Sequence, residues 1–196
     1  QLVMTATPIP RTLAMSAYAD LECSVISGLP PGRMPVNTAL ISNSRRAQVT
    51  DRILQACNSG QQAYWVCTLI EESEQLQAQA AEATAESLRS KLHNLKVGLI
   101  HGRMKATETQ EIMVGVDVPN ATLMVIENPE RLGLAQLHQL RGRVGRGSTQ
   151  SHCIMLYQNP LSENSRKRLT VMRESTDGFF IAERDLELRG PGQVLG

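Results

Sequence analysis

Five short apolar runs recur along the chain, and each has the length of a strand that is buried on both faces of a sheet. They span residues 36–41, 63–70, 97–102, 122–127 and 152–157. Helical patterns fill the intervals between them: 44–57 starts at Ser44, which can cap a helix, and 71–92 has an acidic first turn. Strands that alternate with helices predict an α/β fold built on a parallel sheet.

The alternation breaks between Met113 and Val114. Thr107 and Gln110 have the spacing of a capping box, which predicts a helix that begins there. That helix and the strand that should follow it need on the order of twenty more residues than the chain offers at this point. We therefore expect a loop to be missing from the sequence between residues 113 and 114. A true deletion is the less favoured explanation.

Turn-forming residues divide the chain into segments. The stretch 28–32 reads Gly-Leu-Pro-Pro-Gly and predicts a linker, and the chain starts in a strand-like run without Met, as if cut from a longer protein. The expected segments are the end of a first lobe at 1–12, an inter-lobe region at 13–35, a second lobe at 36–158 and a helical hairpin at 159–196.

Composition narrows the classes of function. Apolar residues make up 41% of the chain and charged residues 20%, which is the balance of a globular domain. The net charge is only +1, so a nucleic-acid partner would have to meet a local basic patch. The four cysteines form no C-x-x-C pair, which makes metal binding and disulfides poor expectations. No apolar run approaches membrane-spanning length.

The clearest chemical signal is the spacing Gln139-x-x-Gly142-Arg143-x-x-Arg146. A helix over 134–143 is expected to present these side chains, and residues three apart share a helical face, so both arginines can reach one anion. A nucleotide γ-phosphate fits, because Arg binds phosphate oxygens bidentately and neutralises charge in the transition state of phosphoryl transfer. The alternative is an exposed basic helix end that interacts with its own carbonyls.

This spacing resembles motif VI of superfamily 2 helicases and translocases, and the longer string 127–146 is similar to that of RecG-type ATP-dependent DNA helicases, which remodel branched DNA. The resemblance covers nearly the whole chain. It implies that 36–158 is the second RecA-like lobe, a parallel sheet flanked by helices. It also implies that the hairpin carries a translocation motif, Asp185-Leu-x-x-Arg189-Gly-x-Gly192. No G-x-x-x-x-G-K-[ST] loop occurs, so ATP and Mg²⁺ are expected on a first lobe outside this chain.

The resemblance assigns the site residues to three groups. The catalytic residues are Gln139, Arg143 and Arg146. The nucleotide-binding residues are Gly115, Asp117, Arg143 and Arg146, with the Asp117 carboxylate on the ribose. The residues that bind DNA or couple its movement to ATP are Thr5, Thr7, Thr68, His101, Arg103, Arg184 and Arg189. The alternatives are a strand–loop–helix junction with capping threonines at 5–12, an Asx-type turn at Asp117 and a solvated hairpin.

Within the hairpin, acidic residues are interleaved with Arg184 and Arg189. A surface of mixed sign is poorly suited to tracking phosphates, which favours unopposed positive charge. We therefore interpret these arginines as latch residues that set the position of the hairpin through internal ion pairs, with DNA contact secondary.

The resemblance also implies partners and a location. These are branched DNA, a first RecA-like lobe and a DNA-wedge domain of the same polypeptide, with a monomeric protein in the bacterial cytoplasm at the nucleoid and no membrane partner. Three alternatives stay open: the equivalent lobe of a transcription-repair coupling factor, a DNA-binding module without a nucleotide role, and an interaction protein whose hairpin docks another polypeptide.

Overall fold

The computed structural model describes residues 32, 34–68, 74–116, 121–145, 147 and 149–189, without the side chains of 74–76, 114–116 and 189. The predictions made for residues 1–31 therefore lie outside the described residues. So do Asp117, Arg146 and the end of the translocation motif.

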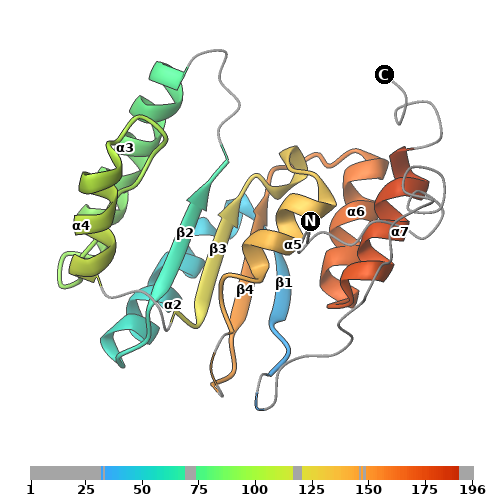
Figure 1. Ribbon diagram of the computed structural model, residues 1–196, viewed down its shortest axis with the longest axis horizontal. Coiled ribbons are helices and arrows are strands. Elements are labelled where there is room, and N and C mark those ends of the chain that lie inside the picture. The colour runs from blue at the N-terminus through green and yellow to red at the C-terminus, as the bar shows by residue number, and fades with distance from the viewer. Residues whose placement is uncertain are drawn as a thin grey trace, which may run out of the picture.

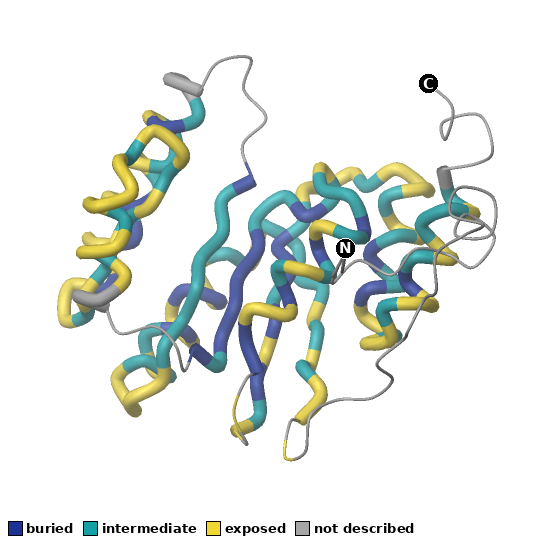
Figure 2. The backbone as a smooth tube through the Cα atoms, in the orientation of Figure 1, coloured by how far each residue is buried: buried dark blue, intermediate teal, exposed yellow. Residues whose placement is uncertain are grey.

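Four of the five predicted strands form one parallel sheet with the order β1-β4-β3-β2 (Figure 1). The strands are β1 (Asn37–Ser42), β2 (Ala63–Cys67), β3 (Leu123–Glu127) and β4 (His152–Tyr157). The central pair, β3 and β4, holds most of the fully buried strand residues, as the dark tube in Figure 2 shows. The predicted parallel α/β fold is confirmed.

Helices lie on both sides of the sheet. They are α2 (Arg46–Asn58), α3 (Glu74–Lys91), α4 (Ala106–Val116), α5 (Leu134–Arg141), α6 (Glu163–Glu174) and α7 (Gly178–Arg189), with short 3-10 helices η1 (Asn43–Arg45) and η2 (Pro129–Arg131). Helices α3 and α4 lie beyond the β2 side of the sheet, and α5, α6 and α7 gather toward the β1 side. None of the described helices is long and apolar enough to cross a membrane.

The alternation of side chains along the strands builds two cores. On β3, Met124 and Ile126 face the cluster that includes α5, α6 and α7, whereas Leu123 and Val125 face the cluster that includes α2. Every one of these four residues is at most 7% exposed. Because both faces are covered, the strand has to be apolar throughout, which is why its sequence is a continuous apolar run.

The predicted strand at 97–102 is wrong. Residues 96–101 belong to no helix or strand, and exposure alternates along them, with Ile100 exposed at 42%. An extended run becomes a strand only when a neighbour supplies hydrogen bonds, and none of the described strands pairs with it. The five residues of β2 are half-buried and not fully buried, because β2 is an outer strand of the described sheet.

Two helix starts differ from prediction. The hydroxyl of Ser42, not of Ser44, accepts a backbone bond, from the Ser44 N–H at the start of η1. Helix α4 begins at Ala106, and the Glu108 carboxylate accepts from the Lys105 N–H, so Glu108 caps this helix in place of the predicted Thr107 and Gln110 pair. The same helix runs without interruption through residues 113 and 114.

Candidate nucleotide-facing turn and its supports

Helix α5 is shorter than predicted and ends at Arg141. Its residues Leu134 and Leu137 are fully buried. At its start, the Gly133 N–H donates to the Gln136 side chain at 3.0 Å, which caps the first turn. Arg143 therefore lies in the turn after the helix, and the argument that placed it on one helical face with Arg146 does not apply. Arg146 itself lies outside the described residues.

The turn after α5 has an exposed polar side and a buried side that packs against the rest of the domain. Gln139, Gly142 and Arg143 are exposed, whereas Val144 is fully buried. Gly145 has φ +75°, and a Cβ there would lie 2.9 Å from Val36 Cγ2, so this position requires glycine. The Arg143 guanidinium is thus held at the surface by a turn with a defined backbone, as recognition of an anion demands.

Arg141, which the sequence analysis did not single out, is only 3% exposed. It is the only buried charged side chain among the described residues. Its Nη1 donates to the carbonyls of Met172 at 2.7 Å and Ser175 at 2.8 Å, and its Nη2 lies 3.1 Å from His138 Nδ1. Burial lowers the pKa of this guanidinium, and burial followed by the charge of Arg141 lowers the pKa of His138. The sequence spacing Gln-x-x-Gly-Arg directs attention to residue 143 and gives no sign of this contact.

The hairpin of α6 and α7 packs onto α5 and the sheet. Ile181 is 1% exposed, and Leu188 packs against the same core. Arg184 pairs with Glu187 at 2.6 Å, and its guanidinium lies 5.2 Å from the Phe180 ring centre. Both of these partners belong to α7 itself, so the recorded contacts of Arg184 do not join the two helices as the latch interpretation expected.

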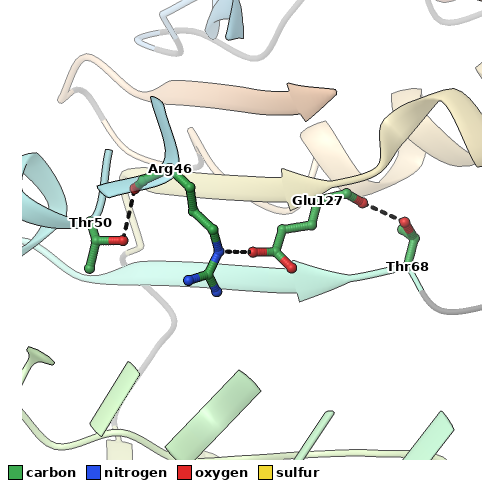
Figure 3. Close-up of polar contacts among 4 residues, drawn as sticks. All are labelled: Arg46, Thr50, Thr68 and Glu127. Atoms are coloured by element: carbon green, nitrogen blue, oxygen red, sulfur yellow. Dashed lines mark hydrogen bonds and ion pairs between the residues drawn. The ribbon is translucent and has the colours of Figure 1, made fainter. Parts of the chain in front are cut away.

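A second polar cluster lies at the carboxyl ends of β2 and β3 (Figure 3). Arg46 Nε donates to the Glu127 carboxylate at 2.6 Å, and the guanidinium lies 5.2 Å from the Trp65 ring centre. The Thr68 hydroxyl contacts the carbonyls of Glu127 and Asn128, and Thr68 is only 7% exposed. A DNA contact through this hydroxyl would require it to leave those carbonyls.

The cluster also contains a backbone feature that the sequence analysis missed. Asn128 follows β3 with φ 48°, in the left-handed region, and its N–H donates to the Leu156 carbonyl at 2.9 Å. Asn tolerates this conformation better than most residues, and such conformations are concentrated at functional sites. The cluster fixes where the chain leaves β3 on its way to α5.

The predicted site residues His101, Arg103 and Gly115 lie on or near α3 and α4. His101 Nε2 lies 3.9 Å from Glu82 on α3, and its Nδ1 accepts from the Arg103 N–H at 3.3 Å. His101 does not lie at a strand end, because 97–101 is not a strand. The Arg103 side chain is exposed. Gly115 lies near the end of α4 and not in a turn.

Burial also determines the chemistry of the thiols. It raises the pKa of Cys67 to about 11, with a smaller raising effect from Glu127, and raises that of Cys153 to about 12. Neither thiol is a nucleophile at neutral pH. Among the described residues, no three His, Cys, Asp or Glu side chains gather as a metal site.

Comparison with known proteins identifies relatives of this chain. No protein-family model matches the chain. The ATP-dependent DNA helicase RecG of Escherichia coli (strain K12) is 62% identical over 215 residues, an alignment that covers 100% of this chain and 31% of the relative. The chain is homologous to one segment of the RecG helicases. RecG of Synechocystis sp. is 51% identical, with 26% of its length covered, and RecG of Staphylococcus epidermidis 44%, with 31% covered.

The solved structures agree with the sequence relatives. The structure of RecG bound to a three-way DNA junction matches with a TM-score of 0.79 and 39% identity, over 96% of this chain and 27% of that one. The chain therefore spans between about a quarter and a third of the length of these RecG proteins. The Escherichia coli alignment holds 215 positions against 196 residues here, a difference of 19. A missing segment between residues 113 and 114 stays a prediction.

Proposed function

We propose that the chain is the C-terminal motor lobe of an ATP-dependent helicase that remodels branched DNA. The observation that carries this proposal is the 62% identity with a RecG helicase across the whole chain. The 39% identical RecG seen on a three-way DNA junction supports branched DNA as the partner class. In this proposal a first lobe and a DNA-wedge domain belong to the same polypeptide, which acts as a monomer.

In the proposed reaction, ATP and its Mg²⁺ are held by the first lobe, and the bound nucleotide supplies the phosphoryl group that is transferred to water. Arg143 and Arg146 approach the γ-phosphate as the lobes close and neutralise the charge that develops there. Gln139 is exposed on α5, four residues before Arg143, and we assign to it the orientation of the arginine or of the attacking water. We assign ribose recognition to Asp117 beside Gly115.

DNA contact and coupling are assigned to Thr5, Thr7, Thr68, His101, Arg103, Arg184 and Arg189. Arg103 is the best supported direct contact among the described members, because its side chain is exposed, whereas the exposed Arg184 side chain pairs with Glu187. Thr68 acts through the backbone carbonyls that it holds at the end of β3. Arg189 acts from the end of α7 and couples the hairpin to lobe closure.

Substitution of Arg143 tests the nucleotide role in a polypeptide that carries both lobes. Arg143→Ala should lower kcat for ATP by about 10³-fold with a smaller change in KM, because an arginine that meets the transition state acts mainly on kcat. Arg146→Ala should behave in the same way. Arg173→Ala is the matched control, since its exposed side chain pairs only with the adjacent Glu174 among the described residues. Wild-type hydrolysis rates in both the Arg143 and Arg146 variants would overturn the proposal.

A further inference from the structure

Arg141 is buried as a cation, and none of the described carboxylates pairs with it. Among the described residues no Asp or Glu oxygen lies within ion-pair distance of it, and its guanidinium is surrounded by the Met172 and Ser175 carbonyls, His138 Nδ1 and, at 3.4 Å, the Thr38 hydroxyl. A buried cation of this kind is costly unless its hydrogen bonds are satisfied. Something other than an ion pair must therefore stabilise it.

The stabilising partner is the carboxyl end of α6. Met172 lies in the last turn of that helix and Ser175 is its C-cap. The last carbonyls of a helix lack intrahelical donors and carry partial negative charge, so a guanidinium that binds two of them satisfies both groups and opposes the helix dipole. The Arg141 side chain, from α5, thus caps the carboxyl end of α6 by binding a carbonyl 31 residues further along the chain.

The same side chain is one of two anchors of the exposed turn. On one side of Arg143, Arg141 fixes the end of α5 to α6. On the other side, Val144 is buried and the Gly145 backbone lies against Val36. Only Gly142 separates Arg141 from Arg143, so a shift of the α6 end would be passed to Arg143 through two peptide units.

We propose that Arg141 is a positioning residue that sets the place of Arg143 from the carboxyl end of α6, so that movement of the α6–α7 hairpin is transmitted to the nucleotide-facing turn. This inference rests on the proposed function, in which Arg143 meets the γ-phosphate. It assigns Arg141 no contact with nucleotide or DNA. It gives the hairpin a direct mechanical connection to the site of hydrolysis.

Arg141→Lys in a polypeptide with both lobes tests the connection. Lysine keeps the charge, but its single nitrogen cannot span the carbonyls of α6 and the His138 ring together. We expect kcat for ATP to fall about 10- to 100-fold with KM little changed, because a small misplacement of a catalytic group has effects of this size. Arg173→Lys, the same exchange at an exposed site on α6, should leave kcat unchanged.

A double-mutant cycle separates positioning from general destabilisation. If Arg141 acts through Arg143, then Arg141→Lys combined with Arg143→Ala should be no slower than Arg143→Ala alone. Multiplied losses in the double variant would overturn the inference. So would wild-type kcat for Arg141→Lys beside a strongly impaired Arg143→Ala, a result that leaves the proposed function intact. Full activity of Arg143→Ala would instead reject the proposed function.

A second variant covers a failure of Arg141→Lys to fold. His138→Leu removes only one acceptor of the guanidinium and leaves both α6 carbonyls in place. Circular dichroism melts establish which variants fold. The folded His138→Leu variant should show a smaller kcat loss with the same non-additivity toward Arg143→Ala, and independent, multiplied losses would again overturn the inference.

Discussion

At the scale of single residues, burial distinguishes contacts that a distance alone would equate. Arg46–Glu127 and Arg184–Glu187 both have an N···O distance of 2.6 Å. The side chains of the first pair are 24% and 14% exposed, and those of the second 48% and 54%. Exposed pairs contribute little because water and salt screen them, whereas loss of one partner of a buried pair leaves an uncompensated charge.

We therefore expect Glu127→Gln to lower the free energy of unfolding by about 2 kcal/mol, since it leaves the Arg46 guanidinium half-buried against Trp65. The matched Glu187→Gln exchange should cost less than about 0.5 kcal/mol. Urea unfolding of the two variants and the wild type measures both values. Equal losses of stability in the two variants would mean that the Arg46–Glu127 pair contributes no more than an exposed pair.

His138 provides a second residue-scale prediction, on pH. Its pKa lies below the ordinary 6.5, first because of burial and then because of the Arg141 charge, with a smaller raising effect from Asp177. Between the lowered value and 6.5 the unfolded chain binds more protons than the folded chain, so stability rises with pH across this window and is lost as the pH falls through it. Acidification from about pH 7.5 to about pH 5 should destabilise the wild type more than His138→Gln. If thermal melts showed the same loss of stability on acidification for the wild type and for His138→Gln, the prediction would be wrong.

At the scale of elements, the sequence predicted the four strands of the described sheet and was wrong at 97–102. Continuous apolar runs located the central strands β3 and β4, because a strand covered on both faces must be largely apolar. The outer strands β1 and β2 were also located by their runs, although their residues are at most partly buried. The same rule failed at 97–102, where an apolar run has no described strand as a partner. Pairing partners are a property of the fold and cannot be read from the run itself.

The candidate site shows the same limit. The prediction placed Arg143 on a helix, whereas it lies in a turn that includes Gly145, whose backbone conformation other residues rarely adopt. The contacts of Arg141 with Met172 and Ser175 join residues more than 30 positions apart, and no local pattern encodes them. Helical spacing misled for Arg143 because α5 ends two residues earlier.

The hairpin carries the element-scale prediction. Of the two arginines interpreted as latch residues, Arg184 pairs within α7, so the latch interpretation now rests on Arg189. In a two-lobe polypeptide, Arg189→Ala should keep DNA binding and much of the DNA-stimulated ATP hydrolysis but lose unwinding of branched DNA. A plain phosphate contact would instead weaken binding and reduce the salt slope by about one unit. Binding titrations at several salt concentrations, beside an unwinding assay, distinguish the two, with Arg173→Ala as control.

At the scale of the whole molecule, the proposed function distributes the parts of the motor over a longer polypeptide. The chain covers 31% of a RecG relative with which it shares 62% identity. Its described polar sites lie at the Arg143 turn, at the carboxyl ends of β2 and β3, and on the hairpin, and the Arg141 contact connects the first of these to the last. In the proposed function, this arrangement would respond to a nucleotide held by the first lobe and pass that response to DNA.

The 196-residue chain alone should therefore not hydrolyse ATP, with or without branched DNA. Binding of the nucleotide phosphates needs a phosphate loop, and the sequence contains no G-x-x-x-x-G-K-[ST]. An arginine such as Arg143 can stabilise a transition state only when the nucleotide is already positioned. Phosphate release from the purified chain, measured beside a two-lobe polypeptide at equal ATP and Mg²⁺, tests this. DNA-stimulated turnover by the isolated chain that disappears in Arg143→Ala would reject the two-lobe proposal, because that loss would exclude a contaminating ATPase as its source.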